Sequence, residues 1–172
     1  MRANRMMALA ALLIAAHACG ERDTDDAAAA PEAAASRNVQ PAPVTAEQFA
    51  SMGWLIGEWR GSGGQYPAFY ESYTRVNDST IQMKAWADST FAVATDSSEI
   101  TWRAGAVQSS SDGKVQNVLV RIGGDSLHFA KVTGQGGDFV WARETPDRWT
   151  AILGSARDGQ QPTIYRLERV RP

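Results

Sequence analysis

Few side chains in this 172-residue chain could do covalent or acid–base chemistry, and three of them stand out. Cys19 is the only cysteine, so it cannot form an internal disulfide and its thiol is open to modification. Glu71 lies between Phe69 and Tyr73, so it would share their inward face if this stretch is a strand. His128 has no His or Cys near it in the sequence, and a single imidazole with scattered carboxylates does not specify a metal site.

An inward carboxylate at Glu71 is costly unless it is paired or has a role in a pocket. Two explanations stay open, namely an ion pair with Arg103 or Arg166, or contact with a ligand. A hydrolase acting through Glu71 or His128 is a third alternative, and it requires these two side chains to lie within hydrogen-bond distance. The chain has no Gly-x-Ser-x-Gly motif. We therefore predict a protein that is not an enzyme, with no metal and no cofactor.

The amino terminus has the layout of a bacterial export signal. Arg2 and Arg5 precede an apolar run over residues 6–16, which is shorter than the roughly 20 apolar residues that span a bilayer. The run leads to Ala18-Cys19, which resembles the lipobox of bacterial lipoproteins. The resemblance implies cleavage before Cys19 and acylation of its thiol. The alternative is an ordinary secretory signal that is cut after Ala18 and leaves a free thiol.

These features divide the chain into three predicted parts. Residues 1–18 form the signal peptide, residues 19–44 an Ala- and Pro-rich disordered tether without aromatic residues, and residues 45–172 the folded domain. The lipoprotein resemblance implies membrane attachment through Cys19 in the bacterial cell envelope. By the same resemblance, Gly20 after the cysteine favours the outer membrane, with the domain facing the periplasm.

The charge balance argues against one class of partner. The whole chain has a formal net charge of −2, and loss of the signal leaves 15 of the 17 basic residues against 19 acidic ones. No stripe of Lys or Arg runs along the sequence. Nucleic-acid binding needs a basic surface, so we do not expect a nucleic acid as partner.

Helical spacing is confined to the start of the folded domain. Residues 45–48 (Thr-Ala-Glu-Gln) have the form of a capping box, in which the first and fourth side chains bond to each other's backbone amides. Phe49, Met52 and Leu55 follow at helical spacing. Gly53 favours the end of the helix. We therefore expect a short helix that covers the mouth of the structure that follows.

Beyond this helix the apolar residues alternate with a period of two, as they do at every second position of residues 80–87. Turn-forming residues recur at short intervals. One such cluster, at residues 96–98, predicts a turn between a strand over residues 91–96 and another over residues 99–104. Because an open sheet leaves its edges exposed, we predict an all-β fold, an antiparallel up-and-down β-barrel of about 8–10 strands.

Residues 57–59 (Gly-Glu-Trp) resemble the Gly-x-Trp start of the calycin superfamily, which includes the lipocalins and lipocalin-like domains of unknown function. The resemblance implies that Trp59 closes the barrel floor. It also implies a late arginine packed over this ring, either Arg166 or Arg169, in a cation–π contact worth about 0.5–2 kcal/mol. Residues 61–67 are more weakly similar to the opening of nitrobindin-like haem barrels. Those proteins need a late histidine that this chain lacks, so we expect no haem.

The aromatic residues suggest what the barrel holds. Tyr70, Trp86, Trp102 and Trp141, together with Glu71, are the predicted lining of a site near the open end. Such linings suit small apolar molecules. The expected function is therefore that of a lipid-anchored envelope protein that binds a small hydrophobic ligand. The alternative is an interaction or structural lipoprotein whose aromatic residues fill the barrel.

Overall fold

The computed structural model describes residues 38–64, 66–133, 137–154 and 161–170. The predicted signal peptide, Cys19 and the first part of the tether, up to residue 37, lie outside this range. Among the described residues, no helix has the length and apolar character needed to cross a membrane.

The helix predicted before the barrel is present and is capped as expected. Helix α1 (Ala46–Ser51) begins at Thr45, whose hydroxyl accepts a hydrogen bond from the Gln48 amide, while the Gln48 side chain accepts one from the Thr45 amide. The chain then continues as a 3₁₀ helix, η1 (Met52–Leu55), so that it passes through Gly53 instead of ending there. Phe49, Met52 and Leu55 are all buried in the core.

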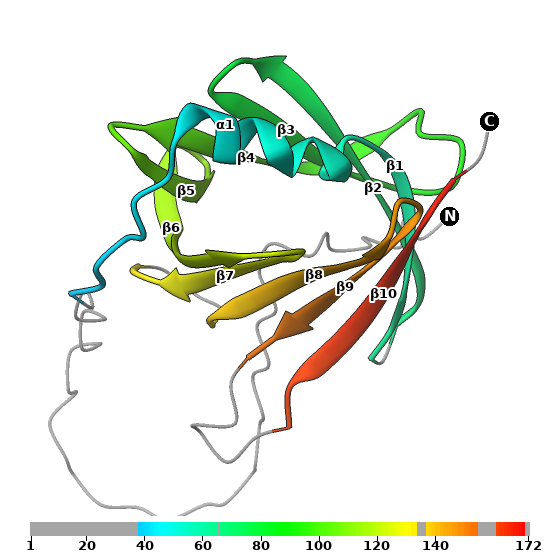
Figure 1. Ribbon diagram of the computed structural model, residues 1–172. Coiled ribbons are helices and arrows are strands. Elements are labelled where there is room, and N and C mark those ends of the chain that lie inside the picture. Colours follow the sequence, from blue (N-terminus) through cyan, green and yellow to red (C-terminus); the bar gives the residue numbers. More distant parts are fainter. Residues whose placement is uncertain (1–37, 65, 134–136, 155–160, 171–172) are drawn as a thin grey trace, which may run out of the picture.

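Ten strands follow in the described residues and close into one barrel, as the period-two pattern predicts (Figure 1). Strands that are consecutive in the sequence pair antiparallel, and β1 pairs with β10 to close the barrel. The all-β up-and-down architecture is therefore confirmed. The strands are β1 (Gly57–Gly63), β2 (Tyr66–Asn77), β3 (Thr80–Trp86), β4 (Ala94–Arg103), β5 (Ala106–Ser111), β6 (Lys114–Gly123), β7 (Ser126–Lys131), β8 (Phe139–Thr145), β9 (Arg148–Leu153) and β10 (Thr163–Arg169).

The turn predicted at residues 96–98 is wrong. These residues lie inside β4, which is one strand where the sequence pattern predicted two. Asp96 has typical turn chemistry, since its carboxylate accepts a hydrogen bond from the Ser97 amide at 2.7 Å. Nevertheless the ladder with β3 continues past it, with Ala85 opposite Asp96. Pairing of residues 96–98 with β3 outweighs the local preference, and the connection from β3 to β4 lies earlier in the chain.

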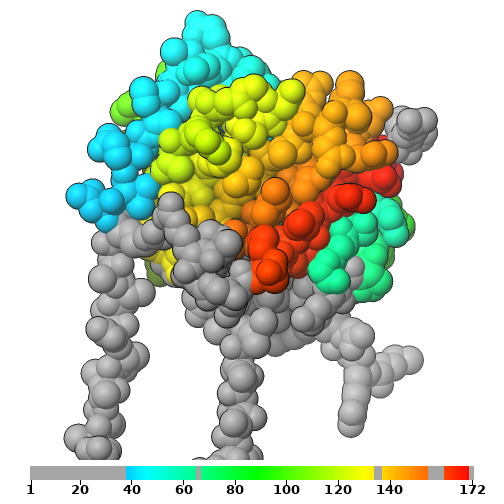
Figure 2. Space-filling view, turned by 60° about the horizontal axis from the view of Figure 1, so that its bottom comes forward, coloured from blue at the N-terminus to red at the C-terminus, as the bar shows by residue number. Residues whose placement is uncertain are grey.

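The two ends of the barrel differ. Helix α1 lies across one end (Figure 1), which we call the closed end. The turns β2–β3, β4–β5, β6–β7 and β8–β9 lie at this end because β1 starts there and the strands alternate in direction. The other five connections lie at the opposite end, which we call the open end. Figure 2 shows the outer wall, with β7 to β10 followed by the first strands around the barrel.

The residues just before α1 belong to the packed structure. The Ala42 amide donates to the Leu119 carbonyl on β6, and the Val44 amide donates to the Gly105 carbonyl in the β4–β5 turn, each at 2.8 Å. Val44 is only 4% exposed. These contacts fall within the range that the sequence assigns to the tether, so the ordered structure extends a few residues before Thr45.

Candidate functional site

The floor of the barrel at the closed end is built around Trp59. Its side chain is 1% exposed, and its indole N–H donates to the Leu55 carbonyl at 2.7 Å. The guanidinium of Arg169 lies over the ring, 4.2 Å from its centroid. Of the two late arginines considered for this contact, Arg169 is therefore the one that packs over Trp59. Arg166 is exposed, because it alternates on β10 with the buried Tyr165 and Leu167 and so points outward.

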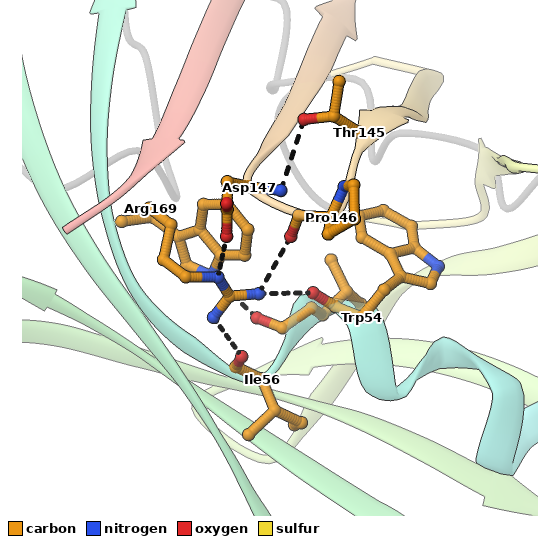
Figure 3. A network of polar contacts seen from close by, with 8 residues as sticks. Trp54, Ile56, Thr145, Pro146, Asp147 and Arg169 are labelled. Carbon is orange, nitrogen blue, oxygen red and sulfur yellow. Dashed lines mark hydrogen bonds and ion pairs between the residues drawn. The ribbon is translucent and has the colours of Figure 1, made fainter. Parts of the chain in front are cut away.

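Arg169 also ties the helix, the floor and the β8–β9 turn together (Figure 3). Its Nη1 donates to the Ile56 carbonyl at 2.8 Å, and its Nη2 to the carbonyls of Pro146 at 3.2 Å and Trp54 at 3.4 Å. Its Nε pairs with the Asp147 carboxylate at 3.1 Å. Four of the five guanidinium N–H donors are therefore bonded within the protein, and Arg169 serves as a structural clamp.

Gly57 explains why glycine precedes the tryptophan in this motif. A Cβ at this position would lie 2.1 Å from Nη1 of Arg169, and the backbone φ is +136°. The backbone conformation disfavours a residue with a side chain, and a Cβ would displace the guanidinium. Glycine at position 57 therefore leaves room for the guanidinium of Arg169 beside Trp59.

Aromatic rings fill the closed half of the interior. Trp149 on β9 packs edge-on against Trp59 and Tyr73, with centroids 6.0 Å apart in each case, and its ring is 5.5 Å from Trp141. Trp141 on β8 reaches Tyr73 on β2 at 5.9 Å. Since β8 and β2 are separated by three strands around the wall, these contacts cross the inside of the barrel. These four rings, which we call the aromatic floor, close the interior at the end that α1 covers.

Glu71 borders the aromatic floor on the side of the open half, and its side chain faces inward. It is 4% exposed, and the register places it between Trp59 and Ala85 on the neighbouring strands. The Tyr73 hydroxyl donates to Oε2 of Glu71 at 2.9 Å. Burial raises the pKa of Glu71 to about 7, although the bond from Tyr73 opposes this effect. Burial and the nearby carboxylate likewise raise the pKa of Tyr73.

The ion pair considered for Glu71 is absent from the described part of the chain. Arg103 and Arg166 are both exposed, on the solvent side of the structure. Glu71 therefore shares its buried position with a hydroxyl and not with a cation. A carboxylate in this position has spare acceptor capacity, because an ionised carboxylate offers about four lone-pair sites.

A second buried polar group lies beside this pair. The indole N–H of Trp149 has no hydrogen-bond partner in the described structure, although the residue is only 1% exposed. Buried donors are nearly always paired with protein or water. The sequence pattern placed Tyr73 on the inward face with Glu71, but neither Tyr73 nor Trp149 was among the predicted site residues. Their contact joins β2 and β9, which are distant in the sequence.

The open half of the interior is lined differently on its two sides. Phe139 on β8 and Leu153 on β9 are half-buried and lie opposite each other in register, and Phe139 stacks on the buried Phe129 at 4.6 Å. Across the barrel, Ser98 pairs with the buried Met83 and Ser109 with the buried Ile100, so both serines share the inner face. Asp96, opposite the buried Ala85, shares that face. One wall is therefore apolar and aromatic, and the other carries two serines and a carboxylate.

Two of the predicted lining residues are on the wrong face. Tyr70 and Trp86 lie opposite each other on β2 and β3. Both alternate with buried residues and therefore point outward, where Phe91 packs against each ring at 5.9 Å. The Trp86 indole donates to the Ser72 hydroxyl at 2.9 Å. The prediction chose these residues for their aromatic character and neglected the alternation, in which inward Met83 and Ala85 force Trp86 outward.

The other predicted lining residues are inside, but only two of them meet. Trp102 packs against the core at the closed end, where its indole donates to the Val44 carbonyl at 2.8 Å. Trp141 belongs to the aromatic floor and, like Glu71, contacts Tyr73. The structure thus brings Glu71 and Trp141 together around Tyr73 and keeps Trp102 apart.

His128 does not join Glu71. It lies on β7 between the buried Leu127 and Phe129, so its ring points outward, where Nη2 of Arg121 is 2.8 Å from its Nε2. Partial burial and the neighbouring Arg121 lower the pKa of His128. A hydrolase that needs Glu71 and His128 in contact is therefore incompatible with this geometry. Within the described ranges, no group of three or more His, Cys, Asp or Glu side chains could hold a metal ion.

Comparisons with known proteins add little to this geometry. No protein-family model matches the chain, and no curated protein matches it. Among solved structures, a redesigned β-barrel is similar, with a TM-score of 0.36 and 11% sequence identity over 69% of this chain and 93% of that one. A likeness this weak carries no argument about function, so the functional interpretation rests on the site.

Proposed function

We propose that the barrel binds a small, mostly apolar molecule in its open half, above the aromatic floor. The observation that carries this proposal is Glu71, an inward carboxylate that is 4% exposed and paired only with the Tyr73 hydroxyl among the described residues. Binding sites are typically apolar with a few well-placed polar groups. Glu71 and Tyr73 supply such groups at the bottom of the open half.

Stability alone does not account for a carboxyl group in this position. Burial of an ionised carboxylate without a cation is costly, and apolar residues of similar volume are often as stabilising or more so. Ionisable groups with strongly shifted pKa values are enriched at functional sites. The raised pKa of Glu71 agrees with such a role.

The lining of the open half fits a molecule with two different sides. Half-buried Phe139, Trp141 and Leu153 offer an apolar surface. The inward serines on β4 and β5 offer hydroxyl groups on the facing wall. Solvent reaches these half-buried side chains, so a ligand that covered them would bury apolar surface, at about 25 cal/mol per Å².

A binding assay with the fluorescent apolar probe phenylnaphthylamine tests this function. We expect the probe to brighten on binding, and Glu71→Arg to abolish binding because a bulky cation would occupy the open half. Glu168→Arg is the matched control, since Glu168 is exposed on the outer face of β10. Equal probe binding by the two variants would contradict the proposal.

The cellular placement is part of the same proposal. The lipobox-like Ala18-Cys19 supports cleavage before Cys19, its acylation, and attachment to the outer membrane with the barrel facing the periplasm. Residues 19–37 would then connect the lipid to the barrel. Mass spectrometry of the mature protein should detect acyl chains on Cys19, and Cys19→Ser should release the protein from membranes. Unchanged membrane retention of that variant would refute the anchor.

The aromatic floor favours a second candidate, an envelope interaction protein with a filled barrel. The rings of Tyr73, Trp141 and Trp149 already contact one another across the closed half. In this case the outer surface carries the function and the interior only stabilises the fold. The probe assay separates the two candidates, because a filled barrel binds no apolar probe.

A further inference from the structure

We infer that the ligand carries a neutral head group that both donates and accepts a hydrogen bond, such as an alcohol or a primary amide, held between Glu71 and the Trp149 indole. This inference rests on the proposed function and names the class of ligand. It follows from two buried polar groups with opposite hydrogen-bonding needs that border the same aromatic floor.

Glu71 supplies the acceptor. The Tyr73 hydroxyl donates to its Oε2, and no other side chain is bonded to the carboxylate among the described residues. The carboxylate therefore has acceptor sites left for a donor brought by a ligand. An alcohol or amide N–H provides one.

Trp149 supplies the donor. Its indole N–H is buried and unpartnered in the described structure. An indole N–H can donate but cannot accept. A buried donor without a partner forfeits the bond that it made with water in the unfolded chain. A hydroxyl or carbonyl oxygen of a ligand would restore that bond.

Both groups adjoin the same rings. Trp149 packs against Tyr73 and Trp59 at 6.0 Å. Tyr73 is the hydrogen-bond partner of Glu71, and Trp59 is its direct neighbour in register on β1. A single hydroxyl group that reached both side chains would donate to Glu71 and accept from Trp149. The apolar remainder of the ligand then extends toward Phe139 and Leu153.

An anionic head group does not fit this position, because the nearby arginines are used elsewhere. Arg169 is engaged with Trp59, Asp147 and three carbonyls at the closed end. Arg75 lies over Phe49 at 5.4 Å, and Arg143 pairs with Asp125 at 3.9 Å. A carboxylate ligand would meet the carboxylate of Glu71, at a cost in affinity. Lys131 shares the inner face of β7 with Phe129, but it lies at the end of that strand and not on the strands next to Glu71.

A cationic head group satisfies only half of the site. An ammonium group would pair well with Glu71, but it has donors and no acceptor. The Trp149 N–H would then remain unpaired. The three head-group classes are therefore distinguishable by experiment with ligands of equal chain length.

The test is competition of decanol, decanoate and decylamine against bound phenylnaphthylamine in the whole protein. We expect decanol to displace the probe about tenfold more effectively than either charged compound, as the loss of one hydrogen bond to a charged or buried group predicts. Stronger displacement by decanoate or decylamine would overturn the head-group inference and leave the proposed function standing. Failure of the probe to bind at all would refute the proposed function as well.

Two variants assign the head group to its partners. Trp149→Phe keeps an aromatic ring and removes the N–H, and Glu71→Met keeps the length and removes the acceptor. Each should reduce the advantage of decanol severalfold while the probe still binds, which also verifies that the variant is folded. Trp86→Phe and Glu168→Gln are the matched controls on the outer face. An unchanged decanol preference in both interior variants would overturn the inference.

Discussion

Two adjoining regions of the interior are built on opposite principles. In the Arg169 clamp the polar groups are paired, since Arg169 bonds to three carbonyls and one carboxylate and the Trp59 indole bonds to Leu55. In the aromatic floor beside it, Trp149 keeps an unpaired donor and Glu71 an underused carboxylate. Both regions are rich in tryptophan. Hydrogen-bond satisfaction, and not aromatic content, separates the clamp from the candidate site.

This contrast has an energetic meaning. A satisfied clamp such as Arg169 stabilises the fold, whereas a buried acid without a cation weakens it. Proteins accept such local costs mainly at functional sites. The comparison therefore predicts that mutations in the clamp and at Glu71 act in opposite directions on stability.

The largest expected effect is at the clamp. In Gly57→Ala the new Cβ would lie 2.1 Å from Nη1 of Arg169, at a φ of +136°, so the guanidinium must leave its seat. We expect a loss of about 3 kcal/mol in the free energy of unfolding, from backbone strain plus the lost contacts of Arg169. Urea denaturation measures it. Gly105→Ala is the control, because Gly105 also has a positive φ but nothing within 4 Å of its Cβ position. An equal loss of stability in both variants would mean that the contacts of Arg169 do not contribute to stability.

The second-largest expected effect is a pH dependence of the free energy of unfolding, caused by Glu71. Its pKa in the folded protein is about 7, against 4.5 for an unshifted glutamate. The folded state therefore holds a proton that the unfolded state has lost, so this contribution is complete below pH 4.5 and is lost as the pH rises to about 7. Relative to Glu71→Gln, the wild type should lose about 3 kcal/mol of stability over this window.

Urea denaturation of the wild type and Glu71→Gln at several pH values measures this difference. Subtraction of the two curves removes the contributions of the other carboxylates. Parallel curves would show that Glu71 titrates as if it were in water, and the contrast between the clamp and the candidate site would then fail.

The smallest expected effect concerns the outer face of the barrel, and it distinguishes that face from the interior. Tyr70 lies on the outer face and packs against Phe91, so Tyr70→Ala should cost only about 1 kcal/mol. It should leave the displacement of phenylnaphthylamine by decanol unchanged. A loss of probe binding would place the ligand on the outer wall and not in the barrel.

The sequence predicted the architecture well because two periodic patterns determine it. The capping box at Thr45 and the alternation at Met83 and Ala85 are local signals, and each is reproduced in the structure. Glu71 was recognised as an inward carboxylate for the same reason. Asp96 was misread because its side chain does form a turn-like bond, while the strand pairing that overrides it involves residues distant in sequence.

The candidate site was harder to predict because it depends on contacts across the barrel. The choice between Arg166 and Arg169 needs the exact register of β10 against β1. The unpaired donor of Trp149 results from packing among β1, β2, β8 and β9 and has no counterpart in the sequence. The predicted inward placement of Tyr70 and Trp86, in contrast, was an avoidable error, because the alternation in the sequence places their neighbours on the inward face.

The bonds from Ala42 and Val44 to the barrel also fix the path by which the chain reaches the fold. Val44 is held at the β4–β5 turn and Ala42 farther down the wall, at Leu119 in the middle of β6, so the segment before α1 runs along the outside of the barrel (Figure 1). A pull on the preceding chain would therefore act first on the side wall at β6, and only then on the helix that covers the end of the barrel.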